Sequence, residues 1–140
     1  MATSAGAMGR GNKVVVAYLD GRRSKGYIFD FSAAKDHFRL LPEEAPLQHQ
    51  GSEVLFHELK AVFFVKDFIG NKDYQESTNF DTAKHGRRIE VSFKDGETFA
   101  GTTEGYNAQK LGFFVFPTDP KSNNIRIFVV NKNVNQVKML

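Results

Sequence analysis

Apolar and polar side chains alternate over residues 88–94, where Ile89, Val91 and Phe93 are separated by charged or polar residues. A period of two residues predicts a β-strand with one buried face. The next two residues, Asp95-Gly96, are typical of a two-residue type I′ hairpin turn, because glycine adopts the positive φ that this turn requires. The pattern therefore predicts a β-hairpin at this point of the chain.

The same hairpin pattern occurs 75 residues earlier. When Asp20-Gly21 is aligned with Asp95-Gly96, residues 13–31 lie over residues 88–106 without a gap. A period of this length exceeds the roughly 20–50 residues of solenoid repeats, so each copy is expected to form a small domain of its own. Further pairs matched at this offset are Gly26/Gly101, Phe31/Tyr106, Phe38/Phe113, Pro42/Pro117, Leu59/Val134 and Val62/Val137.

Each copy contains five short apolar or alternating segments, which predict five strands. We expect an all-β fold in which an internal duplication gives two small five-stranded SH3/Sm-like barrels packed together. Gly26 and Gly101 fall inside the second strand of each copy, where glycine marks a bulge or a sharp bend.

The expected units are a flexible tail at 1–12, a first barrel repeat at 13–66, an acidic linker at 67–86 and a second barrel repeat at 87–140. The expected strands are 13–19, 22–31, 37–41, 54–56 and 60–65 in the first copy, then 88–94, 97–105, 112–116, 125–130 and 134–140 in the second, with a short turn at 73–80.

The first strands of the two copies differ in their outer faces. Residues 14–19, with the sequence VVVAYL, are apolar on both faces, whereas the aligned segment alternates with polar residues. A strand that is apolar on both faces requires cover on both faces. This strand is therefore expected to pack against the second barrel or against another chain.

The segments LDGRRSKGYIFDFS, HFRLLP and LKAVFFV resemble the Sm-like pattern of strand, turn, glycine, an apolar residue followed by Asp, and a short closing motif. Phe29-Asp30 stands at the Asp step of that pattern. The family's RNA pocket uses Asn at the position that holds Ala34 in the first copy and Gln109 in the second. The resemblance therefore implies the barrel fold rather than uridine binding.

The whole chain also resembles an uncharacterised bacterial family of short β-rich domains, through its DG…KG, LKAVFFVKDF…GN and PKSNN stretches. Members of that family are sometimes joined to PilZ domains, which bind cyclic di-GMP. The resemblance implies a setting in bacterial signalling. It assigns no ligand-binding residue.

The composition excludes several classes of protein. The 140 residues include no Cys, so disulfides and thiolate metal sites are absent. No run approaches the roughly 18 apolar residues of a membrane span, and the first residues lack the apolar core of a signal peptide, so a cytoplasmic protein without a membrane partner is expected. The four His are scattered and no nucleophile motif occurs, so we expect no metal, no cofactor and no enzymatic activity.

Two polar stretches are candidate ligand-binding sites, although each also fits a solvated turn. In the first, a basic hairpin, guanidinium groups match phosphate geometry and a Tyr ring offers a stacking face. The second is a loop rich in amide groups, which can bind a polar ligand. The residues are Arg22, Arg23, Lys25 and Tyr27 in the basic hairpin, and Lys121, Asn123, Asn124 and Arg126 in the amide-rich stretch.

The expected function is that of a non-enzymatic binding or regulatory module in the bacterial cytoplasm, which docks a partner protein or associates with itself. The alternative is binding of a nucleic acid or a nucleotide similar to cyclic di-GMP through the basic hairpin at residues 22–25. The net charge of +3 permits such a ligand without requiring it. Salt separates the two hypotheses, because phosphate contacts weaken steeply as salt rises and apolar protein interfaces do not.

Overall fold

The computed structural model describes residues 11–44, 51–70, 74–75 and 86–140, and within them it is all-β, as expected. Residues 1–10 of the expected tail and most of the turn expected at 73–80 lie outside the described residues. The elements are β1 (Asn12–Tyr18), β2 (Arg23–Ile28), β3 (His37–Pro42), β4 (Ser52–Leu55), the 3-10 turn η1 (Phe56–Glu58), β5 (Leu59–Val65), β6 (Arg87–Phe93), β7 (Thr98–Thr103), β8 (Gly112–Pro117), β9 (Asn124–Val130), the 3-10 turn η3 (Asn131–Asn133) and β10 (Val134–Met139).

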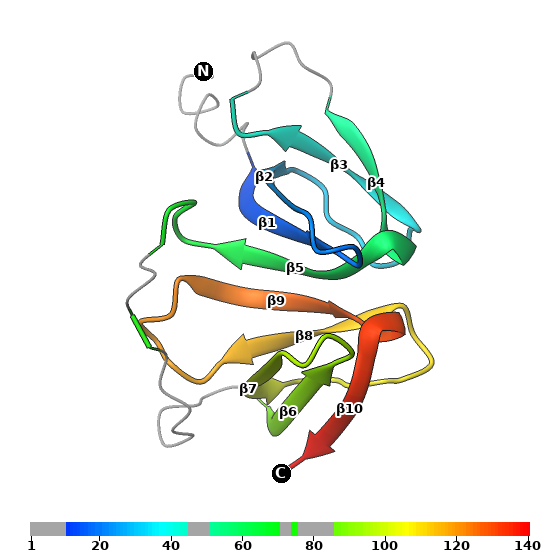
Figure 1. Cartoon of the computed structure of the whole chain (residues 1–140), viewed down its shortest axis with the longest axis vertical. Coiled ribbons are helices and arrows are strands. Elements are labelled where there is room, and N and C mark those ends of the chain that lie inside the picture. Colours follow the sequence, from blue (N-terminus) through cyan, green and yellow to red (C-terminus); the bar gives the residue numbers. More distant parts are fainter. Residues whose placement is uncertain (1–10, 45–50, 71–73, 76–85) are drawn as a thin grey trace.

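The strands form one antiparallel ten-stranded sheet with the order β10-β6-β7-β8-β9-β5-β1-β2-β3-β4. The N-terminal half, β1 to β5, and the C-terminal half, β6 to β10, meet where β5 pairs with β9, and these two strands run side by side through the middle of the molecule (Figure 1). Strands β4 and β10 lie at the two ends of the strand order.

The two halves share one pairing register. Each residue pairing among β1 to β5 recurs among β6 to β10 with both residue numbers raised by 75. Gly26 pairs with Pro42, for example, and Gly101 pairs with Pro117. The 3-10 turns also correspond, because each one directly precedes the last strand of its half.

The Asp-Gly hairpins join the expected strands, but the expected type I′ turn is wrong. Gly21 has a φ of 93° and Gly96 a φ of 96°, while no residue other than glycine among those described has a positive φ. The Tyr18 N–H donates to the Arg22 carbonyl at 2.9 Å, which leaves three residues in the loop. Three-residue hairpin loops of this kind place glycine at their left-handed position.

Gly26 and Gly101 are required by a close approach between strands. A Cβ added to Gly26 would lie 2.3 Å from the Leu41 carbonyl oxygen, and one added to Gly101 would lie 2.3 Å from the Phe116 oxygen. Neither glycine has a positive φ. The constraint is therefore the space between the second and third strands of each half.

The apolar side chains form two cores, one in each half, and strand β1 contributes to both. Val14 and Val16 are fully buried in the first core. On the opposite face of β1, Ala17 is buried in the second core and Val15 packs against it. The expectation that this strand packs against the second half is confirmed.

Strands β5 and β9 also contribute to both cores. All seven residues of β5 are buried. Phe128 and Val130 of β9 enter the first core, while Ile127 and Val129 enter the second. The C-terminal half therefore completes the core of the N-terminal half.

Lys60 is the one buried charge of β5, with 4% of its surface exposed. Its ammonium lies 2.7 Å from an Asp95 carboxylate oxygen and also binds Glu97. It lies 4.7 Å from the centre of the Phe93 ring. This ion pair joins β5 to the hairpin turn between β6 and β7, and the buried Lys60 ammonium depends on the two more exposed carboxylates for charge compensation.

The Gly101→Val substitution is expected to destabilise the protein by about 1–3 kcal/mol, because the new side chain overlaps the β8 backbone. Thermal unfolding measures the loss. Gly105→Ala is the control, since a Cβ at Gly105 meets nothing within 4 Å. An unfolding midpoint unchanged by Gly101→Val contradicts the close approach.

Asp95 makes stability depend on pH. Its carboxylate accepts a hydrogen bond from Lys60 and another from the Glu97 backbone, and these hold its pKa below the ordinary value of 3.8. The stabilisation is present above that ordinary value and is lost as the pH falls through the lower folded value.

The Asp95→Asn variant is therefore expected to melt earlier than wild type at pH 7 and to lose less of its midpoint between pH 7 and pH 3. Asp20→Asn is the matched comparison, because Asp20 occupies the equivalent turn and its pKa is also lowered, but its partner Arg22 is exposed. Its effect on the pH curve is therefore expected to be smaller. Parallel pH curves for wild type and Asp95→Asn exclude this role.

Candidate functional site

The cations of the basic hairpin are engaged by neighbouring groups. The Arg22 guanidinium lies 2.7 Å from an Asp20 carboxylate oxygen and 4.4 Å from the Tyr18 ring centre. Hydrogen bonds from the Arg22 backbone and side chain lower the pKa of Asp20. The Arg23 guanidinium lies 5.4 Å from the centre of the Phe63 ring. Both arginines are exposed, yet each rests on an aromatic ring of its own half.

Lys25 and Tyr27 contact the segment that follows β5. The Lys25 ammonium donates a hydrogen bond to the Phe68 carbonyl at 2.9 Å. The Tyr27 and Phe68 rings meet edge to face with their centres 5.4 Å apart. These two residues of the basic hairpin therefore hold the beginning of the expected linker against β2.

The amide-rich stretch contacts the same segment. The Asn123 side chain donates to the Asp67 carbonyl at 2.8 Å and accepts from the Asp67 N–H at 3.1 Å. The Asn124 N–H donates to the Ser122 hydroxyl, and the Lys121 N–H donates to the Asp119 carboxylate at 2.8 Å. Their hydrogen bonds shape the loop before β9.

Arg126 lies between two aromatic rings. Its guanidinium is 4.4 Å from the ring centres of Phe64 and of Phe114. Burial lowers the pKa of this guanidinium. Arg126 thus joins β5 to β8 across the intervening strand β9.

The two predicted stretches therefore meet at one place, because Lys25 and Tyr27 contact Phe68 while Asn123 contacts Asp67. Arg22, Arg23, Lys121 and Arg126 are engaged elsewhere, and none of the three cavities described for the structure is lined by more than one of the eight residues.

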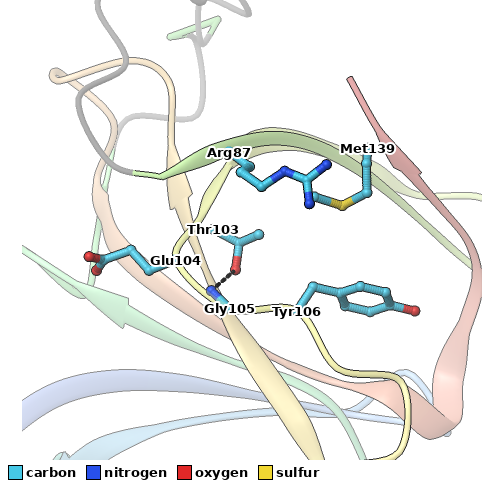
Figure 2. A pocket seen from close by; sticks show the side chains of 6 residues that line it. All are labelled: Arg87, Thr103, Glu104, Gly105, Tyr106 and Met139. Carbon is cyan, nitrogen blue, oxygen red and sulfur yellow. Dashed lines mark hydrogen bonds between the residues drawn. The ribbon is translucent and has the colours of Figure 1, made fainter.

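A cavity of about 240 Å³ lies at the end of the C-terminal half, and the sequence did not predict it. Figure 2 shows Arg87 and Met139 facing the Tyr106 ring across this cavity. The half-buried Tyr106 packs edge to face on Phe113, with ring centres 4.8 Å apart. The Thr103 hydroxyl donates to the Phe114 carbonyl at 2.7 Å and orders the floor. The cavity is lined by Arg87, Thr103, Glu104, Gly105, Tyr106 and Met139.

The equivalent place in the N-terminal half is filled. Phe31, which corresponds to Tyr106, has its ring centre 5.1 Å from that of Phe128 and 5.8 Å from that of Phe114. Both rings come from the C-terminal half, on β9 and β8. Met139 of β10 lines the cavity, and its equivalent on β5, Phe64, has its ring centre 6.0 Å from that of Phe114. The cavity therefore lies where a hairpin equivalent to β8–β9 would cover β10.

The opposite end of the sheet is polar. Arg39 and Glu53 stand at the positions equivalent to Phe114 and Phe128, and both are exposed. The β3–β4 hairpin therefore lacks the two rings with which the β8–β9 hairpin covers its neighbour. A shift of 75 residues applied to the aromatic positions shows this difference in the sequence alone.

In the described ranges, the structure has no helix whose length and apolar character suit it to cross a membrane. The same ranges bring together no group of three or more His, Asp and Glu side chains that could hold a metal ion.

A model of a family of unknown function, DUF6982, matches residues 10–140. No curated protein and no solved structure matches the chain.

Reversing the charges of the basic hairpin with Arg22→Glu and Arg23→Glu is expected to leave the unfolding midpoint within about 3 °C of wild type, because exposed ion pairs stabilise little. Arg126→Glu is the contrasting variant. It is expected to lower the midpoint more, because it removes a cation stacked on Phe64 and Phe114 and places a carboxylate against the same rings at a half-buried position. Equal midpoints for the two variants, measured by circular dichroism, contradict these assignments.

Proposed function

The chain belongs to the DUF6982 family, and we propose that it is a non-enzymatic module that docks a partner protein at the outer edge of β10. The bacterial signalling setting implied by the resemblance to PilZ-linked domains is part of this proposal. Function depends on the site rather than on the fold, and the geometry of the C-terminal half supports this proposal.

We infer further that each half is one SH3/Sm-like barrel unit and that the two arose by duplication. The shared register at an offset of 75 residues supports this, as does the 3-10 turn before the last strand of each half.

The observation that carries the proposal is the difference between β5 and β10. The outer edge of β5 is paired with β9, whereas no strand of the described chain pairs with the outer edge of β10. An unpaired edge is a template for another strand. The cavity beside Tyr106 adds a place for a side chain next to that edge.

The two faces of β10 differ in polarity. Val137 and Met139 pack against the second core, while Gln136 and Lys138 are exposed. Charged and polar residues on an edge strand limit indiscriminate pairing. The face of β10 toward the cavity is therefore apolar, and the opposite face is polar. The polar face lowers the tendency of this edge to aggregate.

A partner protein is favoured over a second copy of this chain. If β4 of another copy paired with β10 as β9 pairs with β5, Glu53 would take the place of Phe128 beside Tyr106. Glu53 would lack the ring that Phe128 packs on Phe31, and its carboxylate would enter a cavity where Arg87 is the one cation in the lining. The alternative of nucleic-acid or nucleotide binding rests on the basic hairpin, where Arg22 and Lys25 already have partners within the chain.

The proposal is tested by using the protein to capture binding partners from a lysate of the cells in which it naturally occurs. Gly105→Trp places a bulky side chain at the rim of the cavity, at a residue whose Cβ meets nothing within 4 Å. Ala108→Trp is the matched control, because Ala108 is exposed in the same loop and does not line the cavity.

We expect proteins that are retained by wild type, by Ala108→Trp and by the Arg22→Glu, Arg23→Glu variant, and are lost with Gly105→Trp. Identical capture by wild type and Gly105→Trp contradicts docking at β10. Bound nucleic acid or nucleotide that disappears at high salt and in the double-reversal variant establishes the alternative instead.

A further inference from the structure

We propose that the partner contributes an extended segment that pairs antiparallel with β10 and lays an aromatic side chain against Tyr106. The inference rests on the proposed function and specifies the chemistry of the partner. We use strand β9 as the template for this segment, because β9 occupies the equivalent place on β5.

The backbone register of the segment follows from the equivalence of β5 and β10. Val62 faces Phe128 and Phe64 faces Arg126 across the β5–β9 pairing. Val137 and Met139 are the residues of β10 that correspond to Val62 and Phe64, because β10 pairs with β6 as β5 pairs with β1. The partner residue opposite Val137 therefore takes the position of Phe128.

An aromatic ring suits that position. Phe128 lies between Phe31 and Phe114, with ring centres at 5.1 and 5.2 Å. In the C-terminal half Tyr106 replaces Phe31, and the cavity of about 240 Å³ lies beside it. A ring in the place of Phe128 packs on the Tyr106 ring, which has only one aromatic neighbour, Phe113, among the ring contacts of the described chain.

Hydrogen bonds order the chain next to this position. Asn131 stands at the position equivalent to Phe56. Its side-chain amide donates hydrogen bonds to the carbonyls of Asn107 at 3.0 Å and Lys110 at 2.8 Å. The Thr103 hydroxyl holds the Phe114 carbonyl on the other side. A preformed floor reduces the entropy lost when a ligand binds.

The outward face of the segment is expected to be polar. Ile127 and Val129 of β9 are buried because β5 has a core on both of its faces. On β10 the residues facing those positions are Lys138 and Gln136, both exposed. The partner segment is therefore expected to carry an acidic residue opposite Lys138 and a polar residue opposite Gln136. The partner segment alternates, with apolar residues toward the cavity and polar residues outward.

Two labelled peptides based on residues 122–132 test this pattern against the full chain. The first, SNNIREFTVNK, carries Ile127→Glu and Val129→Thr and keeps the aromatic residue. The second, SNNIREETVNK, adds Phe128→Glu, which reproduces the side chain that Glu53 would bring. Fluorescence anisotropy measures their affinities for wild type, Gly105→Trp and Ala108→Trp.

We expect the first peptide to bind wild type and Ala108→Trp at least tenfold more tightly than Gly105→Trp, and the second peptide to bind wild type at least tenfold more weakly than the first. Amide NMR shifts are expected at Val137 and Met139 rather than on β5. Equal binding of the two peptides, or no binding, overturns the inference.

Two further outcomes separate this inference from the proposed function. If a lysate protein is lost with Gly105→Trp while neither peptide binds, docking at β10 stands and the strand-pairing inference is wrong. If sedimentation velocity shows wild type associating with itself and Gly105→Trp abolishes that association, the occupant is a second copy and the inference is also wrong.

Discussion

The pairing of β5 with β9 is the interaction on which the rest of the structure depends. It joins the two halves into one sheet, and it places both strands between two cores. Each half is too small to bury a large core alone, which makes shared apolar surface valuable. Because β9 contributes Phe128 and Val130 to the first core, the N-terminal half is complete only in the presence of the C-terminal half. Among the described strands this arrangement occurs once, so none of them pairs with β10 as β9 pairs with β5.

Local patterns in the sequence were sufficient to predict the strands and hairpins, because alternation and Asp-Gly pairs act within a few residues. The constant offset predicted the shared register, and the doubly apolar segment of β1 predicted contact with the second half. The turn type was wrong because Asp20 and Asp95 have negative φ and a third residue enters each loop. The pairing partner of β9 was not predicted, since the four buried residues Ile127–Val130 signal cover on both faces without identifying what provides it.

The candidate site was harder to predict because its character depends on contacts between distant segments. Asn123 meets Asp67 and Lys25 meets Phe68, so groups that suggested a ligand-binding surface hold a connecting segment in place. Arg126 is stacked on Phe64 and Phe114 rather than presented to a phosphate. The cavity beside Tyr106 required comparison of the halves, because it is defined by rings that the N-terminal half receives from its neighbour and the C-terminal half does not. The residue pattern within one copy alone cannot show which rings the other copy supplies.

The separation of β5 and β9 along the chain has a consequence for biosynthesis. Val65 ends β5 and Val130 ends β9, so at about 5–20 residues per second the ribosome needs roughly 3–13 s to supply the covering strand. During that interval the nascent N-terminal half exposes the edge of a strand that is buried along its whole length in the finished protein. Such an edge is an attractive target for chaperones and for neighbouring nascent chains on the same message. Slow translation before β9 therefore prolongs the period in which the edge of β5 has no partner strand.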